Sequence, residues 1–443
     1  MFPFRTNLLA SSVMSGVIKG ASMLTMLVLM VLIGRYGGAD ALGAYSLGMT
    51  FITIITLLSL LGIPSLLMRE VGRNFHNDTL HVGRIKGNYI AALTINSGIN
   101  MVLASLLFFF AEFISMHIFH SFLLIPVLEA ASFVLLPAAL ITLHSNLIQG
   151  AHQPNLALAF QALYTPLFTL IALAIFLYFG VGNANLASMT MKSYAVGAWI
   201  VFFSSFYYWL MIAKGVFKDF SIQLELQNFG SSLFKNGSPF LLAGIGIAVL
   251  NMADILMLGA LSTVAETGHY YASNRLAAGL TLIVFSVNNV LAPKLASSFA
   301  RADMTSFSAY VRHGVLVGFI PTLILAIAMY VFSSELLNLF GTDFHQAKLM
   351  FAILLLGNLF NAIAGPAGWV LNMGGFEKDF QTIILTAATL NIILNFVLIS
   401  NYGAIGAAIA TMTTTVIWNI HSALIAYKRL GVCTVVGLNF WLK

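Results

Sequence analysis

The sequence predicts an all-α polytopic membrane protein with about twelve transmembrane helices. Its apolar residues fall into stretches of roughly 20 residues, each long enough to cross the ~30 Å hydrocarbon core as a helix. Charged residues make up 8% of the 443 residues and apolar residues 60%, against about 25% and 45–50% in ordinary globular domains. The mean hydropathy of +0.95 also indicates that a bilayer, and not water, surrounds most of the chain.

Short connections separate the apolar stretches along the chain. The spans are expected at 11–33, 42–67, 87–110, 121–147, 156–179, 192–213, 238–262, 269–293, 314–334, 346–371, 381–400 and 404–427. The first stretch is too long for the core of a signal peptide and lacks a small-residue cleavage pattern, so it is predicted to be a retained span. The longest polar connection, 214–236, is too short to fold around a core of its own.

Lysine and arginine are distributed unequally between the two sets of connections. With the N-terminus in the cytoplasm, the cytoplasmic side contains Arg5, Arg69, Arg73, Arg84, Lys86, Lys214, Lys218, Lys235, Arg301, Arg312, Lys378, Lys428, Arg429 and Lys443. The opposite side contains only Arg35, Lys192 and Lys348. This asymmetry follows the positive-inside rule, so both termini are expected in the cytoplasm. The net charge of +6 therefore does not predict a nucleic-acid partner.

An internal repeat with one constant sequence offset relates the two halves of the chain. Matching positions are Gly34 and Gly259, Gly43 and Gly268, Tyr45 and Tyr270, Arg69 and Lys294, and Gly150 and Gly375. Because each half has an even number of spans, both halves start on the same side and are expected to be parallel repeats. The predicted domains are a six-helix bundle at 1–213, a cytoplasmic linker at 214–237 and a second six-helix bundle at 238–443. Two such bundles are typical of alternating-access transporters.

Several chemistries are excluded or disfavoured by what the sequence lacks. There is no GxxxxGK[ST] phosphate loop, so direct ATP-driven pumping by this chain is not expected. Cys433 is the single cysteine, which rules out an intramolecular disulfide and a cysteine-based metal cluster. No cofactor is predicted.

Five segments resemble bacterial O-antigen repeat-unit flippases of the Wzx type. They are GRYGGADALGAY at 34–45, GIPSLLMREVGR at 62–73, NRLAAGLTLIVFSVNNVLAPKLA at 274–296, GPAGWVLNMGGFEKDF at 365–380 and NIILNFVLISNYGAIGAAIAT at 391–411. That family is part of a superfamily that includes the MATE drug antiporters and the lipid II flippase of peptidoglycan synthesis. The similarity covers essentially the whole chain.

The resemblance implies a MATE-like fold and the translocation of a lipid-linked oligosaccharide. The expected substrate is an undecaprenyl-pyrophosphate-linked repeat unit of O-antigen or a similar surface polysaccharide. It would move from the inner to the outer leaflet of the bacterial inner membrane by alternating access, without ATP. Lipopolysaccharide biosynthesis, contact with membrane lipids and a polysaccharide polymerase as partner are further implications.

Two basic residues within the spans are candidates for binding the pyrophosphate. An ionisable side chain at bilayer depth costs ~2.5–3.5 kcal/mol, so each one needs a physical reason. Lys19 shares a helical face with Ser12, Ser15, Ser22 and Met26. This polar stripe is expected to face a wet cavity. The alternative is that the Lys19 side chain extends along the helix to the cytoplasmic headgroups. Arg275 can form a bidentate fork with phosphate oxygens. The resemblance implies arginines in spans 1 and 8, so Lys19 is a departure.

Asp254 offers a competing explanation for Arg275. Both are expected at nearly the same depth in adjacent spans, so they can form a static ion pair that does not touch substrate. A third possibility joins the two interpretations, with Asp254 holding Arg275 until substrate phosphate competes for it.

Two acidic residues are candidates for ion coupling. Asp254, with Asn251 one turn earlier, is a type of site that exchanges a proton or binds Na⁺. Glu129, expected in the middle of its span, is the rival candidate; the alternative is a buried acid with a purely structural role.

Two other functions remain open from the sequence. A MATE-type cation-coupled multidrug antiporter predicts a cavity dominated by acids, whereas both bases and acids are expected within the spans here. A membrane polysaccharide polymerase or glycosyltransferase predicts a long outer loop with arginines or a DxD-like acidic pair, and neither is present. An enzyme is therefore not expected.

Overall fold

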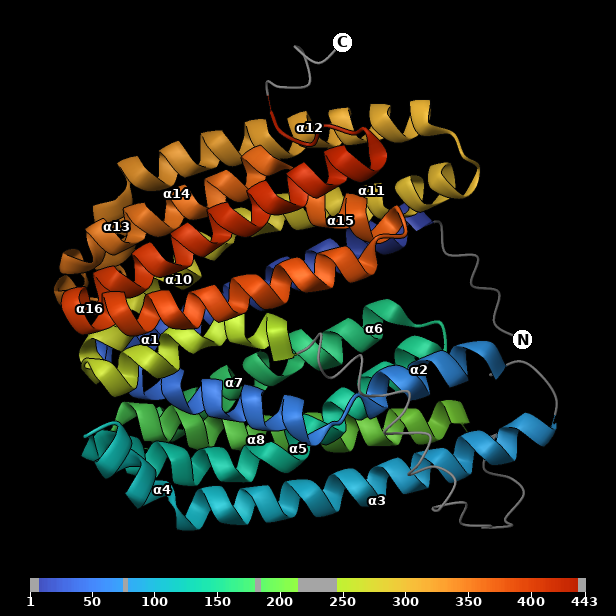
Figure 1. Ribbon diagram of the computed structural model, residues 1–443. Helices are drawn as coiled ribbons and strands as arrows, with labels where there is room; N and C mark the ends of the chain where they lie inside the picture. Colours follow the sequence, from blue (N-terminus) through green and yellow to red (C-terminus); the bar gives the residue numbers. More distant parts are fainter. Residues whose placement is uncertain (1–7, 75–78, 180–184, 214–244, 437–443) are drawn as a thin grey trace. The chain divides into compact units, whose positions relative to one another are not determined.

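The computed structural model describes residues 8–74, 79–179, 185–213 and 245–436 (Figure 1). Throughout these ranges the regular secondary structure is helical, as the sequence predicts. The chain divides into two compact units. Unit 1 comprises Met1–Ile33 and Ala44–Ile245, and unit 2 comprises Gly34–Gly43 and Gly246–Lys443. The expected linker at 214–237 lies outside the described residues, so the predicted domain boundaries stay a prediction.

Unit 1 is built from long apolar helices joined by short turns. Its helices are α1 (Leu8–Ser59), α2 (Ile63–Asn74), α3 (Thr79–Phe109), α4 (Ala111–Phe113), α5 (Ile125–Gly150), α6 (Pro154–Leu158), α7 (Tyr164–Tyr178) and α8 (Leu186–Ile212). Two π-helical turns, η1 (Ile114–Ile118) and η3 (Ala159–Leu163), and a 3₁₀ turn, η2 (Phe122–Leu124), complete it.

Unit 2 follows the same plan. An apolar helix at Ile245–Leu261 is followed by α10 (Val264–Ala277), η5 (Ala278–Leu280), α11 (Thr281–Ala300), α12 (Met304–Val331), α13 (Ser333–Asn338), η6 (Thr342–Ala347), α14 (Lys348–Ala364), α15 (Ala367–Met373) and α16 (Glu377–Leu430). Counting both arms of α1 and of α16, the described residues provide the twelve apolar crossings that the sequence predicts.

The longest helices, α1 and α16, each turn back on themselves at a glycine (Figure 1). With a rise of ~1.5 Å per residue, a straight helix of 52 or 54 residues would far exceed the thickness of a bilayer. Gly38 (φ 76°) interrupts α1 and Gly403 (φ 56°) interrupts α16. Positive φ is accessible to glycine without a steric penalty, so these residues permit the reversal.

The central helix of unit 1 is α5, which packs against α2, α3 and α8. A polar contact joins three of these helices within the apolar interior. His144 of α5 is fully buried; its Nε2 atom lies 3.1 Å from the Tyr89 hydroxyl of α3, and its Nδ1 atom lies 3.2 Å from Ser205 Oγ of α8. Because buried polar atoms need partners, this network favours one packing of the three helices.

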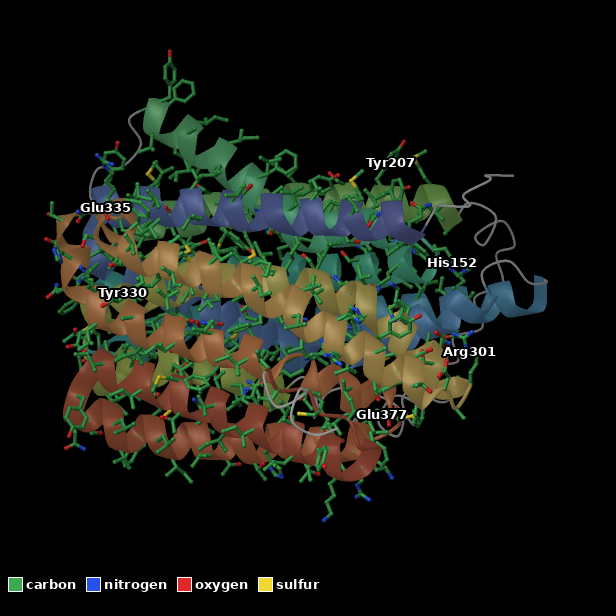
Figure 2. All side chains as sticks on the ribbon, turned by 90° about the horizontal axis from the view of Figure 1, so that it is seen from above. His152, Tyr207, Arg301, Tyr330, Glu335 and Glu377 are labelled. Atoms are coloured by element: carbon green, nitrogen blue, oxygen red, sulfur yellow. The ribbon has the colours of Figure 1, made fainter. Side chains whose placement is uncertain are left out.

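Unit 2 has an apolar core, and charged side chains lie at both of its ends. Phe307, Val311 and Val315 of α12 form the core with residues of α11, α15 and α16. Figure 2 shows Arg301 and Glu377 at one end of the unit, and Tyr330 and Glu335 at the other. Lys378, next to Glu377 in the chain, and Arg429, whose Nε atom contacts Asp379 Oδ2 at 3.0 Å, also lie at the Arg301 end.

The structure corrects two of the expected spans. The expected span 42–67 is broken, because α1 ends at Ser59 and α2 starts at Ile63 after Leu61 (φ 51°) and Gly62 (φ 75°). The expected span 346–371 is also broken, since α14 ends at Ala364 and Gly365 (φ 66°) separates it from α15. Both breaks lie in apolar sequence, so hydropathy alone could not reveal them.

The repeat appears in unit 2 as a reciprocal contact between matched positions. A Cβ atom built on Gly43 would overlap the carbonyl oxygen of Val264, and one built on Gly268 would overlap that of Ala39. The offset of the repeat relates Gly43 to Gly268, and the same offset relates Ala39 to Val264. Each partner therefore presents the same residue positions to the other, as in a two-fold contact between identical subunits.

Candidate polar site in unit 2

Asp254 is the centre of a buried polar cluster in unit 2. Its side chain is 1% exposed. Its Oδ1 atom accepts a hydrogen bond from Asn395 Nδ2 at 2.7 Å, and its Oδ2 atom accepts from the hydroxyls of Tyr270 and Thr411, each at 2.6 Å. These residues come from the helix Ile245–Leu261, from α10 and from the two arms of α16. The carboxylate thus ties together four helical segments.

A second layer of amides extends the cluster along α16. Asn395 donates to Asn391 Oδ1 at 3.0 Å, and Asn391 donates to Thr414 Oγ1 at 3.3 Å. The Oδ1 atom of Asn395 is buried and has no hydrogen-bond partner among the described residues. Carboxylate, amide and hydroxyl oxygens are the ligands that hard cations prefer. The cluster therefore combines one buried carboxylate with the neutral oxygen atoms of amide and hydroxyl side chains.

The structure does not form the ion pair between Asp254 and Arg275. Arg275 lies in the last turn of α10, its side chain is exposed, and its guanidinium carbon lies 5.0 Å from the centre of the Tyr271 ring. Within the described part of the chain, the partners of Asp254 are neutral. Arg275 is therefore available to bind an anion, as one of the sequence interpretations requires.

Asn251 does not belong to the cluster, although the sequence places it one turn before Asp254. It is exposed and donates to the carbonyl oxygen of Ile247 in its own helix, at 2.7 Å. The amides that do reach Asp254 come from α16, so the expected pairing of Asn251 with Asp254 is wrong.

Lys19 lies on α1 in unit 1 and is half-buried. Two serines of the polar stripe on this face form hydrogen bonds with neighbouring helical segments. Ser15 donates to Asn155 Oδ1 of α6 at 2.6 Å, and Ser22 donates to the Ala162 carbonyl of η3 at 2.7 Å. The expectation that this stripe faces a wet cavity stays a prediction.

Glu129 lies near the start of α5 and not in the middle of a span. It is half-buried, and no described residue hydrogen-bonds its carboxylate. The apolar span runs from Phe122 to Gly150, so Glu129 lies in its first third.

Sequence reasoning missed Tyr270, Thr411, Asn391 and Asn395. A signal was present in the two asparagines, which lie four residues apart in an apolar helix and therefore share one face. Polar side chains in membrane helices usually face other helices and hydrogen-bond across them. The i, i+4 pair thus marked the buried face of α16, but not its partner.

Comparisons with known proteins agree with this architecture. The family model described as polysaccharide biosynthesis protein matches residues 6–299, and the MatE model matches residues 239–397. A probable low-salt glycan biosynthesis flippase of Haloferax volcanii, Agl15, is 25% identical over 224 residues, which cover 47% of this chain and 46% of the relative. The chain spans about half the length of the curated relatives it matches.

Two solved structures show the same fold. The lipid II flippase MurJ, in an inward closed conformation, has a TM-score of 0.74 and 15% identity, with 93% of this chain and 87% of that chain covered. An inward-facing multidrug resistance MATE family transporter of the MOP superfamily has a TM-score of 0.71 and 14% identity, with 95% and 98% covered.

Proposed function

The chain belongs to the polysaccharide biosynthesis protein family, and from this premise we propose that it is a flippase for a lipid-linked oligosaccharide. The family match carries the proposal, and the similarity to a probable glycan biosynthesis flippase and the MurJ-like fold support it. The substrate we favour is an undecaprenyl-pyrophosphate-linked repeat unit of O-antigen or a similar surface polysaccharide. It would be moved outward across the bacterial inner membrane and handed to a polysaccharide polymerase.

The distribution of basic residues supports an orientation for this transport. Arg301, Lys378 and Arg429 lie at one end of unit 2, whereas Glu335 lies at the other (Figure 2). By the positive-inside rule the Arg301 end faces the cytoplasm. The end of α16 is then cytoplasmic, and an even number of crossings places the N-terminus on the same side.

In this proposal Lys19 and Arg275 attract the pyrophosphate. The exposed guanidinium of Arg275 offers paired N–H donors, which match two phosphate oxygens and keep their charge at any physiological pH. The half-buried ammonium of Lys19 adds a point charge on a flexible stem. The lipid tail remains in the bilayer while the glycan crosses.

The Asp254 cluster is the proposed site of coupling to a Na⁺ or proton gradient. A carboxylate that is 1% exposed inside an apolar helix bundle carries a large desolvation cost. A bound cation or proton offsets that cost while the neighbouring oxygens complete the site. Because the cluster joins four helical segments, its occupancy biases their packing and thereby the transport cycle.

The first test is the sidedness of the cell's lipid-linked oligosaccharide. Deleting the gene should leave this lipid in the cytoplasmic leaflet, and wild type should restore its export. Well-expressed Lys19→Ala and Arg275→Ala variants should fail to restore it. Unchanged sidedness in a strain without another flippase would reject the function. Rescue by both variants would show that Lys19 and Arg275 have a packing role and are not needed for transport.

The coupling proposal is tested separately in proteoliposomes with imposed gradients. Asp254→Asn should abolish the acceleration of transport by a Na⁺ or proton gradient, whereas Asp343→Asn, at an exposed carboxylate of the same unit, should retain it. Glu129→Gln tests the rival acid in the same assay. A double variant, Asp254→Asn with Glu129→Gln, that still responds to both gradients would remove the coupling proposal.

A second candidate function is the MATE-type export of organic cations, which the MatE match at 239–397 favours. It predicts that proteoliposomes export cationic dyes against a gradient. Dye export together with unchanged sidedness of the lipid-linked oligosaccharide would establish this alternative in place of the flippase.

A further inference from the structure

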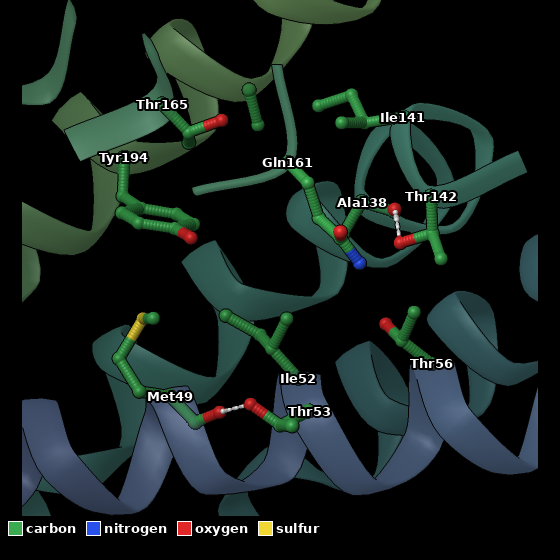
Figure 3. A pocket seen from close by; sticks show the side chains of 11 residues that line it. Met49, Ile52, Thr53, Thr56, Ala138, Ile141, Thr142, Gln161, Thr165 and Tyr194 are labelled. Atoms are coloured by element: carbon green, nitrogen blue, oxygen red, sulfur yellow. Dashed lines mark hydrogen bonds between the residues drawn. The ribbon is translucent and has the colours of Figure 1, made fainter. Parts of the chain in front are cut away.

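Unit 1 contains a polar cavity, open on one side, that is separate from Lys19 and Glu129. It measures about 220 Å³ and lies between α1, α5, η3, α7 and α8 (Figure 3). Its polar lining consists of Thr53, Thr56, Thr142, Gln161, Thr165 and Tyr194. Among the described residues that line it, none is charged. The cavity therefore offers hydrogen bonds without selecting for an ion of either sign.

Several of these polar groups have bonding capacity that the described protein does not use. Thr165 is 5% exposed, and its hydroxyl forms no hydrogen bond with any described residue. The Thr56 hydroxyl is likewise buried without a partner in the described part of the chain. Buried polar atoms are normally satisfied, so such groups in a cavity wall indicate a ligand that donates and accepts hydrogen bonds.

The remaining threonines present acceptor oxygens to the cavity. The Thr53 hydroxyl donates to the Met49 carbonyl at 2.8 Å, and the Thr142 hydroxyl donates to the Ala138 carbonyl at 2.9 Å. Each of these hydroxyls already donates its hydrogen bond to the backbone, so its oxygen lone pairs remain to accept a hydrogen bond. The lining therefore supplies acceptors as well as donors.

Gln161 and Tyr194 complete the site from two further helical elements. Gln161 lies in the π-helical turn η3, and its amide points past Ala138 toward Ile52 and Thr56 in the view of Figure 3. Single π-turns of this kind are frequent at functional sites, because the extra residue changes the direction of the side chains. The half-buried Tyr194 ring lies at the wall of the cavity and provides a flat apolar face.

We propose that this cavity is a subsite for one uncharged sugar ring of the transported glycan. This inference rests on the proposed flippase function and names a recognition site within it. Sites for drug-sized ligands measure roughly 300–1,000 Å³, so a cavity of about 220 Å³ suits a single ring. Sugar hydroxyls both donate and accept, as the lining does, and the C–H face of the ring packs on Tyr194. The pyrophosphate binds elsewhere.

The test measures sugar binding directly on the full-length protein in lipid nanodiscs. Saturation-transfer NMR would use methyl β-N-acetylglucosaminide and methyl β-galactoside as probes. Wild type should give transfer to at least one probe, and Gln161→Ala and Thr165→Val should each reduce it about tenfold. Matched controls are Gln149→Ala and Thr94→Val, at exposed positions outside the cavity, and both should resemble wild type.

Conservative variants separate recognition from folding. Thr165→Ser keeps the hydroxyl and should retain most of the binding that Thr165→Val loses. No transfer to wild type, or equal transfer in wild type, Gln161→Ala and Thr165→Val, would overturn the subsite. Sugar binding without any effect of gene deletion on glycan sidedness would leave the subsite standing and reject the flippase function, so the two failures are distinguishable.

Discussion

Tyr270 and Tyr271 are neighbours in α10 and differ in their hydrogen bonding. Both are almost fully buried. The Tyr270 hydroxyl donates to Asp254 at 2.6 Å and lies 2.9 Å from the Thr411 hydroxyl. The Tyr271 hydroxyl is buried without a hydrogen-bond partner among the described residues. The same chemical change at these two positions should therefore have different consequences.

We expect Tyr270→Phe to destabilise the protein by ~1.5–3 kcal/mol, because it removes a hydrogen bond to a charged group and leaves the buried carboxylate less satisfied. Tyr271→Phe removes a buried hydroxyl that has no described partner, so its effect should lie within ~0.5 kcal/mol or stabilise. Denaturant unfolding of both variants in one detergent measures the difference. Equal losses would contradict the assigned role of Tyr270.

The sequence identifies the ionisable residue at the centre of this cluster but not its surroundings. Asp254 is visible as a charge in an apolar stretch. Its partners Tyr270, Asn395 and Thr411 lie 16, 141 and 157 residues away along the chain. A helical repeat relates residues three or four positions apart, so it suggested Asn251 and could not indicate α16.

At the scale of the element, the reversal within α16 depends on a glycine and a carboxylate. Glu266 of α10 accepts a hydrogen bond from the Ala404 backbone N–H at 2.8 Å and another from Ser262 Oγ at 2.7 Å. Ala404 starts the second arm of α16, where N–H groups have no partner within the helix. The negative charge of Glu266 there also interacts favourably with the positive end of the helix dipole.

Gly403→Ala should destabilise unit 2 by more than ~2 kcal/mol. A Cβ atom there would require a strained positive φ, at ~1–2 kcal/mol, and would lie 3.0 Å from the Glu266 carboxyl carbon. Gly318→Ala in α12 is the control, because a Cβ there meets no atom within 4 Å and alanine favours a helix interior by ~1 kcal/mol. Thermal unfolding compares the two, and a neutral Gly403→Ala would contradict the model of a tight reversal.

Hydropathy predicts where the long helices lie but not where they bend. The connection between the last two expected spans falls at 401–403, and the structure places the reversal at Gly403. The break before α2 was missed because Leu60, Leu61 and Ile63 are as apolar as the span that precedes them. Positive φ at Leu61 and Gly62 creates that break, and apolar composition does not report backbone conformation.

At the scale of the whole molecule, the internal repeat has a structural counterpart in the contact of Gly43 with Gly268. Gly43→Ala and Gly268→Ala should each destabilise the protein and by similar amounts, ~1–3 kcal/mol or more, since both push a Cβ into a backbone carbonyl. Gly20→Ala is the control, with no atom within 4 Å of its Cβ. Thermal unfolding of the three variants provides the comparison. If only one of the two substitutions lowered the stability, the two sides of the contact would not contribute equally to it.

The orientation of the chain in the membrane can be measured by labelling its single cysteine, Cys433. The two ends of α16 lie together, since Arg429 Nε contacts Asp379 Oδ2 at 3.0 Å, and Cys433 follows directly after this helix. Glu335 lies at the opposite end of unit 2 from Glu377 (Figure 2). If the positive-inside rule holds, Cys433 faces the cytoplasm and position 335 faces outward.

A membrane-impermeant maleimide should therefore label Cys433 in inverted vesicles and not in intact spheroplasts. Glu335→Cys in a Cys433→Ala background should show the reverse pattern. Labelling after detergent solubilisation controls for the reactivity of the half-buried thiol. Because the two sites lie at opposite ends of one unit, labelling of both from the same side would contradict a membrane-spanning unit 2. A consistent exchange of the two patterns would instead invert the orientation and the direction proposed for transport.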